Sequence, residues 1–168
     1  MKKLVIFAGP PCTGKSAVGR ALGHAHLEMD AARVSLMPAS THSREDRATA
    51  YRAVLWAAGH LLRYTDVVIC NGGFGHAEQR EAYEAVAREA GAALYVIEFA
   101  APAEILVERN RKRRDHHPGL DLDDARVREI VKNYPWRGDG LVVDATRPVA
   151  ACAEAVATYL KTAGMVPE

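Results

Sequence analysis

The sequence predicts an α/β protein of three layers, in which a parallel sheet is covered by helices on both faces. Short segments of continuous apolar residues alternate along the chain with segments in which apolar residues recur at helical spacing. A strand that is apolar on both sides must be buried on both sides, which is typical of parallel sheets. We expect a single domain over residues 1–168, since the chain contains no repeat, linker or low-complexity segment.

Composition supports a folded domain with a real core. The chain has 168 residues, 49% of them hydrophobic, and folding of a chain this long buries roughly 69% of its surface. The 22 Lys and Arg residues nearly balance the 21 Asp and Glu residues, which leaves a formal net charge of +1. This balance excludes disorder and a surface generally adapted to polyanions, but it allows a local basic site.

The expected location is the cytoplasm, with no membrane partner. No apolar run approaches the roughly 20 residues that cross a bilayer. Residues 1–9 begin with two lysines and an apolar stretch, but this stretch is too short for a secretory signal and leads into a glycine-rich motif. The three cysteines, Cys12, Cys70 and Cys152, are far apart and show no metal-ligand spacing, which favours reduced thiols.

The elements of the first half follow from apolar patterning. Residues 4–8 are a β-branched apolar run that ends at a Gly-Pro pair, and residues 15–22 follow as a helix. Residues 26–29 are a weak strand candidate. In residues 44–62 six apolar side chains fall at helical spacing, and residues 66–70 form a continuous apolar strand stopped by Asn-Gly-Gly.

The second half repeats the alternation. Residues 76–90 are expected as a helix that Gly91 ends, and residues 93–99 as the fourth strand. Pro102 is expected to open a helix that runs to residue 114, because proline favours the first helical position. Asp121 is the expected N-cap of the next helix. The remaining elements are a helix over residues 121–133, a strand over 141–143 and a helix over 148–163.

One motif in the chain identifies a phosphate site. Residues 9–16, GPPCTGKS, fit G-x-x-x-x-G-K-[ST] completely and lie between an expected buried strand and a helix. Backbone N–H groups of such a loop converge on the β-phosphate, whereas a chance glycine-rich turn would not need this context. ATP and Mg²⁺ are therefore the expected cofactors. The residues expected at the nucleotide are Gly9, Pro10, Pro11, Cys12, Thr13, Gly14, Lys15, Ser16 and Ala17.

Three residues of this motif have individual expectations. Lys15 would reach the β- and γ-phosphates and stabilise the transferred group, and the Ser16 hydroxyl would hold Mg²⁺. Cys12 has two interpretations: a thiol whose pKa is lowered by the helix dipole, or a variable loop position, which we favour.

An aspartate and an arginine, Asp30 and Arg33, follow the weak second strand. Asp30 is the candidate catalytic base, which would orient a hydroxyl or accept its proton, and it is also a candidate Mg²⁺ ligand through a water molecule. Arg33, three residues later, shares a helical face with Asp30 and would hold a polar or anionic group of the substrate. The alternative is an Asp N-cap followed by a solvated arginine.

With these residues the chain resembles the P-loop kinases related to polynucleotide kinase, zeta toxin and chloramphenicol phosphotransferase. The similarity covers about residues 4–145 and includes the P-loop, the Asp30-x-x-Arg33 pair, residues 43–52, residues 67–81 and the arginine-rich residues 108–114. The resemblance implies a five-stranded parallel sheet in the order 2-3-1-4-5. It also implies transfer of the ATP γ-phosphoryl group to a hydroxyl, without identifying that hydroxyl.

The chain departs from this group at the end of the third strand. Members commonly have an Asp there, and this chain has Asn71, which brings no negative charge to Mg²⁺. Either Asp30 takes both roles, or Ser16 and ATP hold most of the metal. Asn71 and Gly72 are nevertheless expected at the substrate, since Asn-Gly-Gly is similar to the substrate loop of shikimate kinase, although the rest of that pattern is missing.

A basic segment follows the fourth strand. Arg109 and Arg113 are four residues apart and share a helical face. In the group that the chain resembles, this segment, here about residues 109–120, forms a lid over the phosphates, with Arg109 binding ATP and Arg113 also stabilising the transferred charge. The alternatives are cations placed at a helix C-terminus and a groove for single-stranded nucleic acid, which would need interleaved aromatic residues that are absent here.

Several other residues have weaker indications. Arg44, Arg47, Arg52 and Arg80 are candidates for the acceptor site, although each is more simply a surface cation; we retain Arg52 and Arg80 as predicted substrate-binding residues. The histidines give no ligand set for zinc. Trp56 is expected in the core, and residues 134–136 are expected to form a packing corner.

The favoured function is an ATP-dependent kinase acting on a small-molecule hydroxyl. A polynucleotide 5′-hydroxyl kinase is the first alternative, which the near-zero net charge disfavours. A nucleotide-binding regulatory ATPase without an acceptor is the second, and only Asn71 favours it.

Overall fold

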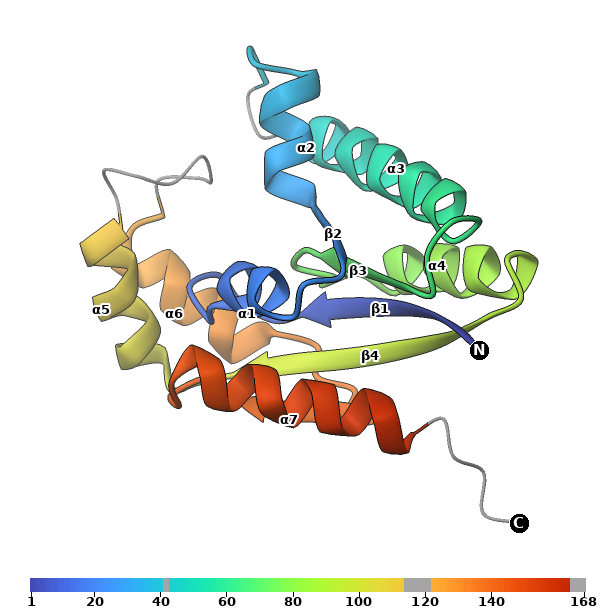
Figure 1. Cartoon of the computed structure of the whole chain (residues 1–168). Helices are drawn as coiled ribbons and strands as arrows, with labels where there is room; N and C mark the ends of the chain where they lie inside the picture. Colours follow the sequence, from blue (N-terminus) through green and yellow to red (C-terminus); the bar gives the residue numbers. More distant parts are fainter. Residues whose placement is uncertain (41–42, 114–121, 164–168) are drawn as a thin grey trace.

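Five parallel strands form one sheet in the order β2-β3-β1-β4-β5, with helices on both faces (Figure 1). This computed structural model describes residues 1–40, 43–113 and 122–163. The predicted fold class and strand order are both confirmed. The strands are β1 (Lys2–Ala8), β2 (Ala25–Glu28), β3 (Val67–Asn71), β4 (Ala92–Ala100) and β5 (Leu141–Asp144).

The six predicted helices are present, and the structure adds one. Met29 to Leu36, which follow β2 directly, form a short helix that the sequence patterning did not separate from its neighbours. The helices are α1 (Lys15–Ala21), α2 (Met29–Leu36), α3 (Arg44–Leu61), α4 (Ala77–Glu89), α5 (Ala103–Arg113), α6 (Asp124–Asn133) and α7 (Val149–Thr162).

The start of α6 corrects the predicted cap. Asp123 is the N-cap, and its carboxylate accepts a hydrogen bond from Arg126 N at 2.7 Å. The expected cap, Asp121, and the expected end of the preceding helix at residue 114 lie outside the described residues. Gly91, by contrast, follows α4 with φ +62° and donates to Arg88 O, as expected of a glycine that ends a helix.

The core consists of two clusters, one on each face of the sheet. Alternate residues of β1 supply both, because successive side chains of a strand point to opposite faces. Leu4, Ile6 and Ala8 pack with side chains of α3 and α4, whereas Val5 and Phe7 pack with side chains of α1 and α7. All five residues are fully buried, so β1 is the central strand of the molecule.

Trp56 does not belong to this core, and the sequence prediction for it was wrong. The buried side of α3 is formed by Ala50, Tyr51, Val54 and Ala58. Trp56 lies two residues from Val54 and from Ala58, and two helical steps are a rotation of about 200°, so its side chain points away from the sheet. It is 75% exposed.

The register places two polar residues beside the end of β1. Asn71 of β3 pairs with Phe7, and Glu98 of β4 pairs with Ala8. The strands are parallel, so the loops that follow them gather at one edge of the sheet. Within the described part of the chain, no helix is long and apolar enough to cross a membrane.

Candidate active site

The loop between β1 and α1 has the backbone conformation that a phosphate-binding loop requires. Gly9 has φ +138°, and a Cβ at this position would lie 2.6 Å from Phe99 O, so only glycine fits beside β4. Gly14 has φ +87° and is the N-cap of α1. The N–H groups of the first turn of α1 lie at the end of this loop, where an anion is favoured.

Lys15 lies at the centre of the loop and is held by neutral oxygen atoms. Its Nζ donates to Gly9 O (2.9 Å), Pro10 O (2.7 Å) and Thr13 Oγ1 (3.1 Å). The side chain is buried, and this burial lowers the pKa of Lys15 to about 8, although the nearby Asp30 carboxylate acts in the opposite direction. A buried ammonium group with only neutral hydrogen-bond partners would bind an anion readily.

Ser16 and Asn71 meet beside this lysine. Asn71 Nδ2 donates to Ser16 Oγ at 2.7 Å, which joins the end of β3 to the first turn of α1. Asn71 is 7% exposed, so this amide is fixed in place. The two side chains offer neutral oxygen atoms, and they fit a Mg²⁺ ion that takes its remaining ligands from phosphates and water. The described residues contain no group of three or more His, Cys, Asp or Glu residues that could hold a metal ion.

Asp30 is half-buried in the first turn of α2, close to both the P-loop and α3. Its charge raises the pKa of Lys15 and also that of Tyr51, which places the carboxylate within electrostatic reach of both side chains. Arg47 of α3 acts to lower the pKa of Tyr51. The predicted base therefore lies beside the phosphate site, between α2 and α3.

Arg33 has a different environment from the one that the sequence suggested. It is 3% exposed and donates from Nη1 to Ser40 Oγ at 2.6 Å, which ties α2 to the segment that follows it. This burial does not favour the predicted contact with a substrate. Arg52 is exposed on α3 and donates to Thr49 Oγ1 of the same helix (3.1 Å), and no hydrogen bond among the described residues joins it to the P-loop.

The last turns of α5 lie against the P-loop. Arg109 Nη1 donates to Cys12 O at 3.4 Å. Arg113 acts electrostatically on both Cys12 and Lys15, so it also lies near the loop. Both arginines are thus brought to the phosphate site, as the resemblance implied. The described residues include the predicted lid segment, residues 109–120, only as far as Arg113.

Cys12 has the properties of a packed loop residue. Burial raises the pKa of its thiol above the usual range, although Arg113, Lys15 and Arg109 all act to lower it. Its Sγ lies 3.6 Å from Asn110 Oδ1, and Asn110 is itself 2% exposed. This raised pKa favours the interpretation of Cys12 as a loop position over that of an activated thiol. Its φ of +66° belongs to the tight turn of the loop.

The loop that follows β3, residues 72–74, is the second component of the site. Gly72 N donates to Phe7 O (3.2 Å) and Gly9 N donates to Gly73 O (3.4 Å), so this loop lies directly beside the start of the P-loop. A Cβ on Gly72 would lie 2.8 Å from the Tyr51 hydroxyl, so the close approach of this side chain favours glycine here. The predicted substrate positions Asn71 and Gly72 therefore lie next to the phosphate site.

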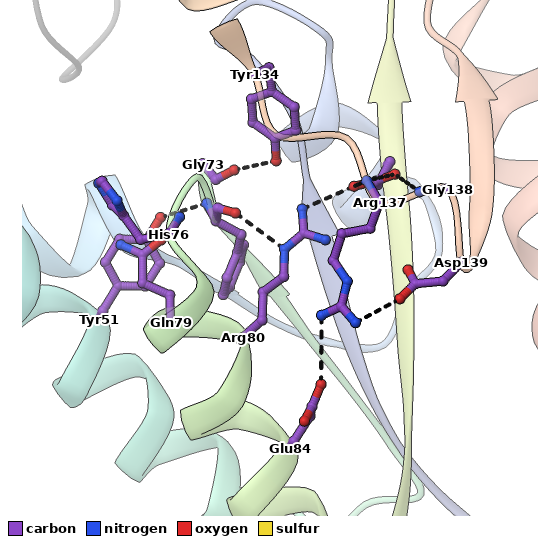
Figure 2. A network of polar contacts seen from close by, with 12 residues as sticks. Tyr51, Gly73, His76, Gln79, Arg80, Glu84, Tyr134, Arg137, Gly138 and Asp139 are labelled. Atoms are coloured by element: carbon purple, nitrogen blue, oxygen red, sulfur yellow. Dashed lines mark hydrogen bonds and ion pairs between the residues drawn. The ribbon is translucent and has the colours of Figure 1, made fainter.

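Two tyrosines fix this loop from opposite sides. Tyr51 Oη of α3 accepts a hydrogen bond from Phe74 N at 3.0 Å, and Tyr134, which follows α6, donates from Oη to Gly73 O at 2.6 Å (Figure 2). Burial raises the pKa of each tyrosine to about 12, so both remain neutral hydroxyls. Tyr134 also packs on Trp136, with ring centroids 4.4 Å apart, and the predicted packing corner is confirmed.

The environment of Arg80 does not favour the predicted contact with the acceptor. Arg80 of α4 is 2% exposed and donates to Glu98 Oε1 at 2.9 Å and, from Nε, to Phe74 O at 3.2 Å (Figure 2). Glu98 is 1% exposed, and it also accepts hydrogen bonds from Arg137 N and Gly138 N. The pair is thus a buried link between the 72–74 loop and the segment after Tyr134.

Sequence patterning missed three residues of this arrangement: Tyr51, Glu98 and Tyr134. A signal existed for Glu98, since a lone carboxylate inside the apolar strand YVIEFA requires a buried partner. Tyr51 belongs to an apolar helix stripe, and a phenol in such a stripe gives no indication of which backbone group its hydroxyl binds. Tyr134 lies 61 residues from its partner Gly73, a separation that only the fold brings together.

Comparison with known proteins agrees with this geometry. A family model described as "AAA domain" matches residues 4–136. A search of curated protein sequences gives no match.

Solved structures share the fold at low sequence identity. An APS kinase (CysC) from Mycobacterium tuberculosis, in complex with AMPPNP and APS, has a TM-score of 0.71 at 20% identity and covers 95% of this chain and 98% of its own. A shikimate kinase from Acinetobacter baumannii, in complex with shikimate, has a TM-score of 0.71 at 18% identity and covers 99% of this chain and 96% of its own. A gluconokinase from Sinorhizobium meliloti 1021 has a TM-score of 0.68 at 18% identity and covers 97% of this chain and 98% of its own. The fold is therefore that of small P-loop kinases.

Proposed function

Since the chain belongs to the AAA domain family and has a P-loop kinase fold, we propose that it is an ATP-dependent phosphotransferase. The γ-phosphoryl group of ATP would pass to a hydroxyl of a small-molecule acceptor. The observation that carries this proposal is the buried Lys15 ammonium group, whose hydrogen-bond partners are all neutral, beside the half-buried Asp30 carboxylate.

Binding of the triphosphate would use groups that already converge. The N–H groups of the loop and of the first turn of α1 would bind the β-phosphate. Lys15 would exchange its bonds to Gly9 O and Pro10 O for bonds to phosphate oxygens, which exchanges neutral acceptors for charged ones. Arg109 and Arg113, which lie across the loop, would neutralise the charge that spreads over the transferred group.

Asp30 is the candidate for the proton of the acceptor hydroxyl. Phosphoryl transfer depends mainly on positioning, so a carboxylate that orients the hydroxyl and accepts its proton completes the reaction centre. The acceptor would lie between α2, α3 and the 72–74 loop, because Asp30, Tyr51 and Gly72 lie there. Solved structures with this fold include kinases named for quite different acceptors, among them APS, shikimate and gluconate, so the fold does not select one.

Mg²⁺ would be held by Ser16, with Asn71 fixing the hydroxyl and Asp30 acting through a water molecule. When bound, the ion would reduce the negative charge of the phosphate groups. Asn71 contributes no charge, so most of the affinity for the metal would come from ATP itself.

The test measures transfer from ATP labelled on the γ-phosphate, with Mg²⁺ and a panel of sugars, small alcohols, antibiotics and a 5′-hydroxyl oligonucleotide. The Asp30→Ala variant would be assayed beside the unmodified protein, with nucleotide binding measured separately. Label in a small molecule, reduced at least 100-fold in Asp30→Ala while ATP still binds, would support the proposal.

Two other outcomes would assign a different function. Label in the oligonucleotide would make the protein a polynucleotide kinase. Label released only as inorganic phosphate, with every acceptor class present, would favour a regulatory ATPase. Unchanged transfer in Asp30→Ala would refute the role of Asp30 as base.

A further inference from the structure

A second concave site lies at the other end of the sheet from the P-loop. It is an open groove of about 470 Å³ between the last turns of α3 and α4, and it reaches Lys2 at the start of β1. In Figure 1 these helix ends lie on the side of the N-terminus, and the loop between β1 and α1 lies on the opposite side. Six residue steps separate Lys2 from Ala8 along β1, so the two sites are about 20 Å apart.

Exposed aromatic rings lie along α3 and the residues that follow it, and two of them, Trp56 and His60, line the groove. Trp56, His60 and Tyr64 follow one another at intervals of four residues, which places them along one side of the helix and its continuation. The Trp56 and His60 rings are stacked, with centroids 5.8 Å apart and planes 11° apart, and the His60 and Tyr64 centroids are 5.5 Å apart. Trp56 is 75% exposed and Tyr64 is 76% exposed. Large aromatic side chains are usually more buried than this, and neighbouring exposed ones often mark a binding surface.

The charge around the rings is mainly positive. Lys2 and Arg63 line the groove beside Trp56 and His60, and Glu89 is the acidic residue among the described lining residues. Neither Lys2 nor Arg63 forms an ion pair with another residue in the described part of the chain. Two cations are therefore available to an anionic ligand next to aromatic faces that are open to stacking.

We propose that this groove and its aromatic row bind single-stranded nucleic acid. Bases stack on aromatic faces in a way that tolerates sequence, and phosphates pair with lysine and arginine, so one ligand satisfies both kinds of side chain. The aromatic residues that such a site needs are absent around residues 109–114. Here Trp56 and His60 line the same groove as the two cations Lys2 and Arg63. The site would be a tethering surface, distinct from the phosphoryl-transfer centre.

A second copy of the chain is a less suitable occupant. In a two-fold dimer that buried Trp56, Lys2 and Arg63 of both copies would approach the same interface, so like charges would face one another. The phosphates of single-stranded nucleic acid are instead negatively charged, so they would pair with these two cations. The proposal does not depend on the identity of the kinase acceptor.

The experiment uses the full chain and its own fluorescence. The sequence contains two tryptophans, Trp56 and Trp136, so Trp136→Phe leaves Trp56 as the only indole reporter. Addition of a 12-nucleotide oligothymidylate at low salt should quench Trp56, whereas a blunt duplex of the same length should not. Trp56→Ala should weaken binding of a dye-labelled oligonucleotide at least fivefold.

Charge variants supply the second measurement. Lys2→Gln combined with Arg63→Gln should flatten the plot of log K against log salt by about 1.4, since each phosphate contact on a single strand contributes about 0.7. Lys132→Gln combined with Lys161→Gln is the matched control, because these exposed lysines lie on α6 and α7, outside the groove. The control should bind with an unchanged slope. The Lys15→Met variant should bind the oligonucleotide as the unmodified protein does, which separates this site from the nucleotide site.

Three results would overturn the proposal. The first is no binding up to 100-fold above the concentration at which a control single-strand-binding protein saturates. The second is binding that Trp56→Ala leaves intact or that Lys15→Met abolishes. The third is a dimer in light scattering that Trp56→Ala dissociates. Since Trp56 is 75% exposed, its variant should fold, and a superimposable thermal melt would verify this.

Discussion

Two buried cations, Lys15 and Arg80, lie near the 72–74 loop, and their surroundings differ. Lys15 has only neutral partners: two carbonyl oxygens and a threonine hydroxyl. Arg80 has a carboxylate partner, Glu98, which is itself 1% exposed. One positive charge is therefore bonded directly to a carboxylate, and the other has only the more distant influence of Asp30.

This difference separates the two roles that buried charge can have. The Arg80–Glu98 pair joins Phe74 O to the backbone of Arg137 and Gly138, so its charges balance without a ligand and it links two segments. Lys15 lacks an ionic partner, and the cost of its burial appears as a pKa lowered to about 8. Bound phosphate would supply that partner. The surroundings of the two side chains therefore differ in the way expected if Arg80 has a structural role and Lys15 binds phosphate, as proposed.

The largest effect is expected from breaking the compensated pair. Glu98→Gln would leave the Arg80 guanidinium buried without a counter-charge, and loss of one partner of such a pair costs about 3–5 kcal/mol of unfolding free energy. Urea denaturation at pH 7 measures the change. The double variant Arg80→Met with Glu98→Gln should recover part of the loss, because it removes the uncompensated charge. Equal destabilisation by the single and the double variant would show that the ion pair is not the cause.

A pH series would test Lys15 in the nucleotide-free protein. Its pKa is about 8 in the folded protein and near 10.5 when unfolded, so between these values the unfolded chain binds more protons and stability rises with pH. The unfolding free energy of the unmodified protein minus that of Lys15→Met should increase by about 3 kcal/mol from pH 7.5 to pH 10.5. A flat difference over this range would mean that the ammonium group is not desolvated.

A smaller effect should follow from filling the space between α3 and the 72–74 loop. Gly72→Ala would place a Cβ 2.8 Å from Tyr51 Oη, and such overpacking typically costs about 1–3 kcal/mol of unfolding free energy. In the background of Tyr51→Phe, which lacks the hydroxyl, the same substitution should cost less. Thermal unfolding of the four proteins of this cycle gives the coupling directly, and additive costs would contradict the proposed clash.

The smallest effect concerns the neutral amide beside Ser16. Asn71→Asp would add a negative charge next to the predicted metal ligand while keeping a side chain that bonds the hydroxyl. The Mg²⁺ concentration for half-maximal ATP binding should fall about tenfold, which corresponds to about 1.4 kcal/mol. Asn71→Ala should not produce this gain. An unchanged Mg²⁺ dependence in Asn71→Asp would place the metal away from β3.

The sequence indicated the position of Lys15 in the fold but not that of Arg80. Lys15 belongs to a contiguous motif whose loop closes on itself within eight residues, so its position follows from local backbone geometry. Asp30 could be placed near the P-loop because β1 and β2 are parallel, so the segments that follow them lie at the same edge of the sheet. These inferences use short segments and the general rules of parallel sheets.

Arg80 and Trp56 show what the sequence did not indicate about the surroundings of a side chain. The partner of Arg80 is 18 residues away on a different element, and an arginine at the start of a helix looks the same in a sequence whether it is solvated or buried. Trp56 was assigned to the core from its apolar neighbours, although its angle around α3 places it outside. Composition near a residue does not determine which side of a helix that residue occupies.

The central claim is that Lys15 is a buried cation without an ionic partner and that bound phosphate would supply one. A pH titration of this one side chain tests that claim most directly. Protein labelled with ¹³C at lysine Cε would be followed by NMR, with the Lys15 signal assigned through Lys15→Arg. We expect a midpoint near pH 8 in the free protein and a clear upward shift with Mg²⁺ and AMPPNP. A midpoint near 10.5 without nucleotide, or one that nucleotide leaves unchanged, would contradict the claim.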